Sequence, residues 1–506
     1  MTNKPPLDLD SLFSVHAEEN ASPTIKANIV QNFAESPINV WCNYHVDAQN
    51  KDPMTEFQEL RFSKGKRHHN FVNETLFSSA IKLSFDSETD GFKQVLELMS
   101  KGTDGIIDMP LICKQLDMTG RPDVMRKVND NPSIFGNHSY EIIEIKSAIK
   151  IKSSHILQAA IYNRMVGKIQ EFTPPVFYII NGNLEEFPYY TDGHDEMLDE
   201  TIQYLIKVIN GQKVTPTLRG AHWPWESYVN KLAIKANDIT LIPGIKAKRR
   251  DQLVDAGLET VNEIADASIE NLTDIKGIGH KTAEKMSACA KALTNESIYI
   301  KQPVPELPKA VTEVFIDLEG SSEYRDGSES STVNYLIGTI VRKNNSAGQF
   351  VSFFADTIAQ ESDNTKEFFE WASSLEAPVF FHWHHYEHTH LKSMGMRFNI
   401  PLNTIDFVLD RMIDLSPIIL ESYAFPIFKE GLKEIAQYLG FNWRLDDVDA
   451  MGSIALFDKF IQSNGTDIDS KTKILTYNED DCEATKFIYD WLTGTPINQT
   501  HLPSQK

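Results

Sequence analysis

Cysteine is scarce in this chain of 506 residues, which holds four: Cys42, Cys113, Cys289 and Cys482. They are scattered and form no Cys-x-x-Cys pair, so neither disulfides nor a self-contained zinc or iron–sulfur site is expected. No apolar run reaches the roughly 20 residues that a membrane-spanning helix needs. The polar start, Met-Thr-Asn-Lys-Pro-Pro, does not read as a secretory signal. We therefore expect a soluble protein of a reducing cytoplasm, without contact to a membrane.

Positive charge is also in short supply. The chain has 49 Lys and Arg against 71 Asp and Glu, which gives a formal net charge of -22. Broad, sequence-blind coating of DNA needs a basic surface, so this balance argues against it. Acidic metal sites and local basic patches are both compatible with such a charge. The length, with 41% hydrophobic and 24% charged residues, suits several globular domains.

Residues 140–146, Tyr-Glu-Ile-Ile-Glu-Ile-Lys, predict a buried strand because isoleucine dominates them. Glu144 and Lys146 leave the same face of that strand, since side chains alternate along it. Burying either charge alone is costly, so the pair needs a partner. Asp123, from the preceding hairpin, would hold a divalent cation together with Glu144, and Lys146 would face charge on an attacked phosphate. The alternative is a surface ion pair on an edge strand.

The neighbouring segments predict an α/β domain. A helix is expected after the buried strand, capped by Ser153 or Ser154, with Gln158 and Tyr162 one turn apart on one face. Hydrophobic patterns predict further elements: strands at 106–113 and 123–128 joined by a turn at Gly120, a strand at 174–182, and a helix at 195–212. Strands flanked by helices fit an α/β core.

The run Gly-Arg-Pro-Asp123, Glu144-Ile-Lys146 and Gln158-x-x-x-Tyr162 resembles the RecB-like branch of the PD-(D/E)XK nucleases. The resemblance implies a nuclease domain over residues 24–236. It also implies Asp123 and Glu144 as metal ligands and Lys146 as a catalytic residue. Gln158 and Tyr162 would then position the nucleic-acid strand.

An early basic segment adds a histidine to this set. RecB-like relatives carry Gly-x-x-His in an early helix, and Gly65-Lys-Arg-His68 matches it, so the resemblance implies His68 as a ligand. Relatives often have Glu where His69 stands, and the alternative is a solvated basic helix face. Many relatives also have a cysteine cluster near the position of Trp223. Only Cys42 is kept here, so we expect no iron–sulfur cluster and apolar packing by the tryptophans.

Residues 237–296 predict a helical unit with two hairpins. Leu241-Ile-Pro-Gly244-Ile precedes Ile275-Lys-Gly277-Ile-Gly279-His-Lys281, which matches a helix-hairpin-helix signature. The glycines allow a tight turn whose backbone N–H groups, at a helix start, can meet a phosphate. Gly277, Gly279 and Lys281 are therefore expected to bind nucleic acid without reading bases. A helical spacer or a protein contact is the alternative.

A second α/β domain is expected over residues 311–495. A linker with three prolines, at 297–310, precedes it, and the segments 1–23 and 496–506 predict flexible ends. The domain opens with the apolar strand Val314-Phe-Ile-Asp317-Leu-Glu319. Strands at 333–341, 349–354 and from 379, and helices at 365–375 and up to Trp491, complete the predicted elements.

Three motifs of this domain resemble the RNase H-like (YprB-type) exonucleases with four acids and a tyrosine. These motifs are Asp317-x-Glu319, His382-x-x-x-Tyr386-Glu387 and Tyr477-x-x-x-Asp481. The resemblance implies that Asp317, Glu319, Glu387 and Asp481 bind two Mg²⁺ or Mn²⁺ ions and that Tyr477 orients the water. His382 replaces the usual Asn and Glu387 the usual Asp. Asp480 is a spare acid that could exchange with Asp481. Four convergent carboxylates fit cations about 4 Å apart that clamp the attacking and leaving oxygens.

Together these motifs predict a metal-dependent nuclease with two active centres. Relatives of the second domain remove nucleotides from 3′ ends, which implies that polarity here. The expected substrate is single-stranded or branched DNA in repair or defence. No Gly-x-x-x-x-Gly-Lys-Ser/Thr phosphate loop occurs, so unwinding would need a separate helicase. Two alternatives stay open: a nucleic-acid- or protein-binding scaffold with a degenerate centre, and a nuclease that acts on RNA.

Overall fold

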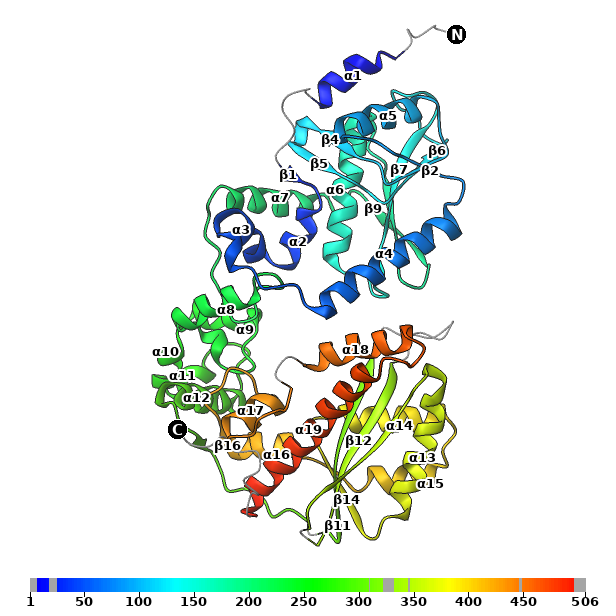
Figure 1. Cartoon of the computed structure of the whole chain (residues 1–506). Coiled ribbons are helices and arrows are strands. Elements are labelled where there is room, and N and C mark those ends of the chain that lie inside the picture. The colour runs from blue at the N-terminus through cyan, green and yellow to red at the C-terminus, as the bar shows by residue number, and fades with distance from the viewer. Residues whose placement is uncertain are drawn as a thin grey trace. The chain divides into compact units, whose positions relative to one another are not determined.

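A computed structural model describes residues 7–17, 25–308, 310–321, 332–344, 346–445 and 448–495 (Figure 1). The chain divides into two compact units, Met1–Leu232 and Ala233–Lys506, which are described one at a time. The expected tail at 496–506 lies outside the described residues. In the part of the chain that the structure describes, no helix combines the length and the apolar character that crossing a bilayer requires.

The first unit is built on a six-stranded sheet with the order β2-β3-β6-β7-β8-β9. Its strands are β2 (Ile81–Lys82), β3 (Gly105–Ile107), β6 (Val124–Val128), β7 (Ser139–Ile145), β8 (Val176–Ile180) and β9 (Glu186–Tyr190). β7 is the predicted buried strand, and every one of its residues is buried. It pairs with β6 antiparallel and with β8 parallel, so the sheet is mixed.

Helices cover both faces of this sheet. They are α1 (Leu9–His16), α2 (Ile29–Glu35), α3 (Pro37–His45), α4 (Glu56–Leu76), α5 (Glu88–Ser100), α6 (Ser153–Ile169) and α7 (Asp195–Ile209). Alternation along β7 separates the two faces: Tyr140 and Ile142 pack in the core that contains α5 and α6, whereas Ile143 and Ile145 pack with Val72 of α4 (Figure 1). Glu144 lies in register with Tyr140 and Ile142, so its side chain leaves the strand toward α6.

Two expectations for this unit were wrong in detail. Leu9–His16 forms a helix that buries Phe13 against Phe92, where a flexible segment was expected; residues 1–6 and 18–24 lie outside the described part. The expected strand at 106–113 is broken, because Asp108 adopts a left-handed φ of 56° and Pro110 follows. Its second half, β4 (Leu111–Cys113), joins β5 (Met118–Gly120) and β1 (Ile25–Lys26) in a separate three-stranded sheet.

The N-cap of the helix after β7 lies just before the two serines expected to cap it. Lys152, not Ser153 or Ser154, is the N-cap, and His155 accepts a hydrogen bond from the Lys152 backbone N–H in a capping box. Ser154 instead donates its hydroxyl to Glu35. A second partner for the serine thus overrides its capping preference.

The second unit begins with a helical part. Its elements are η3 (Ile239–Leu241), α9 (Ala247–Asp255), α10 (Val261–Asp266), α11 (Ile269–Thr273) and α12 (His280–Asn295). α8 (Glu226–Lys235) precedes them and contains the boundary between the two units. Gly244 (φ 86°) and Gly277 (φ 90°) form the turns before α9 and α12, and only glycine takes such backbone angles without strain.

A five-stranded sheet with the order β13-β12-β11-β14-β15 forms the rest of this unit. Its strands are β11 (Thr312–Ser321), β12 (Val333–Lys343), β13 (Gln349–Phe354), β14 (Pro378–His382) and β15 (Met412–Asp414). β11 to β13 are antiparallel neighbours, and β14 and β15 continue parallel to β11. The register between β11 and β12 shifts between Glu319 and Gly320, an irregularity of the kind often found beside active sites.

Helices also cover both faces of this second sheet (Figure 1). One face packs against α16 (Leu415–Ser422), α17 (Leu432–Tyr438), α18 (Ala450–Gln462) and α19 (Ile468–Thr493), and the other against α13 (Glu361–Ser374), α14 (Tyr386–Arg397) and α15 (Leu402–Leu409). Phe315 of β11 belongs to the first core, whereas Val314 and Ile316 belong to the second. Asp317 and Glu319 follow the alternation of Phe315, so both acids point toward α18 and α19.

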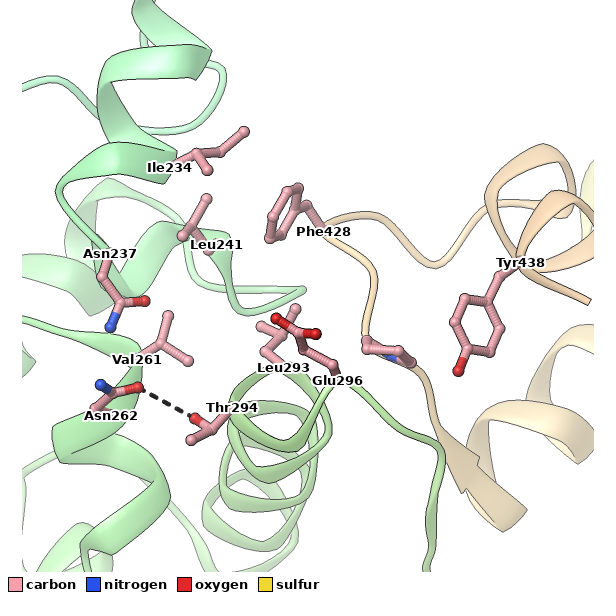
Figure 2. A pocket seen from close by; sticks show the side chains of 11 residues that line it. Ile234, Asn237, Leu241, Val261, Asn262, Leu293, Thr294, Glu296, Phe428 and Tyr438 are labelled. Atoms are coloured by element: carbon pink, nitrogen blue, oxygen red, sulfur yellow. Dashed lines mark hydrogen bonds between the residues drawn. The ribbon is translucent and has the colours of Figure 1, made fainter.

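The proline-rich linker is anchored, although the sequence predicted a spacer. Within it, β10 (Tyr299–Ile300) pairs antiparallel with β16 (Tyr423–Ala424). A pocket of about 470 Å³ lies between the helical part and the loop before α17, where Phe428 points toward Leu241 and Ile234 (Figure 2). The helical part therefore packs directly on the α/β part of its own unit.

Candidate functional sites

Three acids of the second unit meet at one point. Asp317 and Glu319 come from β11 and Asp481 from α19, and one carboxylate oxygen of each lies within 4.8 Å of the others. These three residues belong to two motifs that the sequence analysis placed in one centre. Hard oxygen ligands at such distances fit a divalent cation of the Mg²⁺ type.

The electrostatics of this acid cluster also fit a cation. Burial first, and then repulsion by Asp481, raises the pKa of Glu319 to about 8. Burial raises the pKa of Asp481 to about 7, and burial together with the neighbouring acids raises that of Asp317 well above its usual value. A nearby cation would offset this repulsion, because an opposite charge favours the ionised carboxylate.

Neutral donors hold these carboxylates in place. Asn478 Nδ2 donates to Asp317 Oδ2 at 2.7 Å, and Trp443 Nε1 donates to Asp481 Oδ1 at 2.7 Å. Asn478 can approach because Gly338 stands opposite Asp317 on β12; a Cβ there would lie 1.6 Å from Asn478 Oδ1. Neither Asn478 nor Trp443 was predicted as a site residue from the sequence. A signal existed only for Asn478, which lies inside the Tyr-x-x-x-Asp motif.

Tyr477 is placed on the same side of α19 as its acid. It bonds to Asp481 one turn later, and burial followed by the charge of Asp481 raises the pKa of the Tyr477 hydroxyl. The phenol therefore stays protonated at neutral pH and can donate a hydrogen bond within the site.

Glu387, the expected fourth ligand, lies in the first turn of α14, which follows β14, and it does not belong to the group of three acids whose oxygens lie within 4.8 Å of one another. The carboxylate is buried and contributes to the raised pKa of Asp317. His382 Nδ1 lies 3.4 Å from Glu387 Oε2, yet neither atom has hydrogen-bond geometry to a partner among the described residues. A buried carboxylate oxygen without such a partner is a chemically suitable position for a metal ligand.

Asp480 does not act as a spare acid. Its two carboxylate oxygens accept from the backbone N–H of Arg444 at 2.7 Å and from the Arg444 Nε at 2.6 Å. Consecutive residues of a helix point about 100° apart, so Asp481 faces the acid cluster while Asp480 faces this arginine. The expected exchange between the two acids is therefore not supported.

The first unit contains a second centre with two acids and a cation. Asp123 precedes β6, and the pairing of Val124 with Ile143 places it beside Glu144. The Asp123 backbone N–H donates to Glu144 Oε1 at 3.2 Å, and the Ile145 backbone N–H donates to Asp123 Oδ2 at 2.7 Å. Lys146 Nζ lies 3.1 Å from Glu144 Oε2. The structure thus brings together Asp123, Glu144 and Lys146.

Burial dominates the acid–base behaviour of this centre. It raises the pKa of Asp123 to about 6, and with the charge of Asp123 it raises the pKa of Glu144 to about 7. Burial lowers the pKa of Lys146, but the attraction of Glu144 and Asp123 outweighs it and leaves that pKa raised. The lysine therefore stays charged beside the two acids.

Gln158 and Tyr162 lie behind the lysine. Gln158 Oε1 accepts a hydrogen bond from Lys146 Nζ, and Tyr162 bonds to Gln158. Tyr162 packs where only glycine leaves room, since a Cβ on Gly120 would lie 2.4 Å from its ring. Both side chains are buried. Their positions suit holding Lys146, whereas the expected contact with the nucleic-acid strand would need an exposed face.

His69, the residue after the expected ligand His68, borders this centre. His69 Nδ1 lies 3.3 Å from Asp123 Oδ1. Burial and the charge of Lys146 lower the pKa of His69, which favours the neutral imidazole that a metal requires. Asp108, which the sequence analysis did not single out, also acts here: its charge raises the pKa of Asp123, and its Oδ2 lies 2.8 Å from Lys82 Nζ.

The tryptophan segment packs as expected. Trp225 is fully buried in a cluster with Cys42 and Val229 and donates its indole N–H to Asn43. Trp223 contacts Phe62 of α4 edge-on, with ring centroids 5.9 Å apart. All four cysteines are buried free thiols.

Comparison with protein-family models finds two matches, both within the second unit. Residues 314–493 match the model described as RNase_H superfamily, and residues 236–292 match the SAM-like Helix-hairpin-helix tandem. A comparison of the sequence with curated proteins finds no match. The chain therefore contains an RNase H superfamily domain preceded by tandem helix-hairpin-helix elements, which indicate a nucleic-acid-binding nuclease. RNase H-like nucleases depend on divalent metals, and the acid cluster lies within the matched residues.

Proposed function

We propose that this protein is a Mg²⁺- or Mn²⁺-dependent DNA nuclease with two active centres. The convergence of Asp317, Glu319 and Asp481, held by neutral donors, is the observation that carries the proposal. In this interpretation the RNase H-like domain removes nucleotides from 3′ ends. The first unit is a RecB-like PD-(D/E)XK nuclease domain.

In the RNase H-like centre, Asp317, Glu319, Glu387 and Asp481 would hold the metal ions. Bound there, two divalent ions would activate a water and stabilise the charge that develops on the phosphate. Asn478 and Trp443 fix the orientation of Asp317 and Asp481. Tyr477 donates toward Asp481 and would orient the attacking water.

In the first unit, Asp123, Glu144 and His69 would form the ligand set. Lys146 carries its charge beside Glu144 and would stabilise the anionic phosphate during attack. Gln158 restrains the Lys146 ammonium by accepting from it. Preorganisation of this kind lowers the cost of reaching the reactive geometry.

The helix-hairpin-helix turns at Gly244 and Gly277 favour a backbone-binding mode. Gly279 caps α12 and Lys281 is exposed in its first turn, so both are available to a phosphate. Such contacts do not read bases, and a single-stranded or branched DNA in repair or defence fits them. A separate helicase would supply unwinding.

The test is cleavage of 5′- and 3′-end-labelled single strands, as matched DNA and RNA, with Mg²⁺, Mn²⁺ or EDTA. Wild type, Asp481→Asn and Lys146→Ala are compared with Asp363→Asn and Lys150→Ala, which change exposed residues of the same types. We expect metal-dependent shortening of 5′-labelled DNA, lost in Asp481→Asn, and a separable part lost in Lys146→Ala. The two control variants should cleave like wild type.

Two results would contradict the proposal. Preferential degradation of RNA would replace the DNA assignment with an RNA exonuclease. Metal-independent binding without any cleavage by wild type would leave a nucleic-acid-binding scaffold as the function.

A further inference from the structure

A groove of about 630 Å³ runs along one side of α12, from Lys281 in the first turn after the hairpin to Lys291. One face of the helix, including Lys281, Lys285 and Lys291, forms one wall, and Tyr299 and Lys301 of the β10 segment contribute to the other. Lys281 and Lys291 are ten residues apart, about 15 Å along a helix. The groove is thus long enough to contact more than one group of an extended ligand.

The groove is rich in positively charged side chains, although the chain as a whole has a net charge of -22. Four lysines line the groove against two acids, Glu284 and Glu421. Lys285 is paired with Glu430 at 2.5 Å, and Lys301 donates to the carbonyl of Leu420. An excess of positive charge in a concave site attracts an anionic ligand.

An aromatic ring and an unsatisfied hydroxyl accompany the lysines. Tyr299 is 38% exposed, and Lys291 Nζ lies 5.9 Å from its ring centroid. The buried Oγ of Ser287, which also lines the groove, has no hydrogen-bond partner among the described residues. A buried polar atom without a partner calls for a water or a ligand atom. Basic side chains beside an exposed aromatic ring are the elements that bind single strands.

A short series of contacts leads from this groove to the acid cluster. Lys285 pairs with Glu430, which precedes Lys433 of α17 by three residues. Lys433 Nζ lies 5.7 Å from the ring centroid of Trp443, and that indole donates to Asp481. Three residues span at most about 11 Å, so the groove and the acid cluster belong to one continuous region of this unit.

We infer that this groove binds a single strand of nucleic acid, with phosphates at Lys281 and Lys291 and a base stacked on Tyr299. The strand is the substrate of the RNase H-like centre, and in this respect the inference rests on the proposed function. The lysines contact the backbone and the tyrosine tolerates any base, so the groove adds affinity without sequence preference.

The test measures binding of the full chain to a 5′-fluorescein-labelled oligo(dT) strand of 20 nucleotides, by fluorescence anisotropy in EDTA over a salt series. EDTA prevents cleavage, so binding is read independently of activity. Variants are the double change Lys281→Glu with Lys291→Glu, Tyr299→Ala and Tyr299→Phe. The matched control is Lys343→Glu with Lys366→Glu, two exposed lysines that do not line the groove.

We expect the groove double variant to bind at least tenfold more weakly, with a salt slope reduced by about 2, because each phosphate contact contributes about 1. Tyr299→Ala should lose roughly tenfold at every salt concentration with the slope unchanged, and Tyr299→Phe should bind like wild type. Equal losses in the control pair and the groove pair would overturn the inference. So would wild-type affinity in both groove variants.

Failure of the groove and failure of the proposed nuclease are distinguishable. Cleavage by wild type with normal binding by the groove variants would reject the groove and keep the nuclease. Weakened binding by the groove variants in a protein that cleaves nothing would keep the groove as a nucleic-acid site and reject the nuclease.

Discussion

The two acid centres of this chain differ in how their carboxylates are compensated. In the first unit, Lys146 supplies a positive charge 3.1 Å from Glu144. In the RNase H-like domain, the hydrogen bonds to Asp317 and Asp481 come from an amide and an indole, which carry no charge. The first centre is therefore partly neutralised by its own residues, whereas the second depends more strongly on cations or protons.

The two centres also differ in how strongly their carboxylates bind protons when no metal is present. Burial raises the pKa of Glu144 to about 7 even with Lys146 present, and that of Glu319 to about 8. Both acids thus hold protons near neutral pH, but the second cluster holds them to higher pH. A cation that binds must displace those protons, so metal occupancy of both centres should rise with pH.

The largest effect is expected when a carboxylate of the uncompensated cluster is removed. Asp317→Asn keeps the shape and the contact with Asn478 but deletes one ligand charge at the centre of the cluster. We expect the 3′-end activity to fall about a thousandfold, the order of several kcal/mol of lost transition-state stabilisation. Single-turnover rates at saturating Mn²⁺ measure it, with Asp363→Asn as the matched surface control. A rate within tenfold of wild type would place the reaction elsewhere.

Removing the internal cation of the first centre should cost less. Lys146→Met preserves much of the side-chain volume but removes the charge beside Glu144, which in our proposal stabilises the phosphate. We expect a loss of roughly a hundredfold in the activity of this centre, typical of one electrostatic contact. The measurement uses an Asp317→Asn background, in which the other centre is silent, and Lys150→Met as the exposed control. Full activity in Lys146→Met would show that the cation serves folding alone.

The sequence predicted much of each centre because local spacing encodes local direction. A spacing of two residues along an extended chain puts Glu144 and Lys146 on one face. A spacing of four residues along α19 puts Tyr477 and Asp481 on one side of that helix. Partners that arrive from distant segments left no such signal: Trp443 reaches Asp481 across 38 residues. The sequence pointed to His68, and the structure shows a contact between its neighbour His69 and Asp123; one residue along a helix rotates the side chain by about 100°. No local pattern separates His68 from His69 without knowing which face of α4 packs on the sheet.

The contrast between the two centres can also be tested by measuring how the stability of the metal-free protein depends on pH. The folded pKa of Glu319, about 8, exceeds its ordinary value of 4.5, so its contribution is fully present below about pH 4.5 and is lost as pH rises to 8. With EDTA, we expect the second unit to lose on the order of 2 kcal/mol between pH 5 and pH 8, about a thirtyfold change in its unfolding equilibrium. Urea denaturation at several pH values measures this. Glu319→Gln should flatten the dependence, while Glu367→Gln, on an exposed position of α13, should leave it unchanged.

The smallest effect concerns the histidine that borders the first centre. His69 lies 3.3 Å from Asp123, and its lowered pKa keeps the ring neutral for a metal. We expect His69→Gln, which removes a proposed ligand, to raise the Mn²⁺ concentration needed for half-maximal activity about tenfold, and His68→Gln to have a smaller effect. Titration of activity with Mn²⁺ in the Asp317→Asn background compares the two neighbours under identical conditions. If His68→Gln is the more damaging change, the ligand is His68, α4 turns its other face to the metal, and the contact between His69 and Asp123 serves packing.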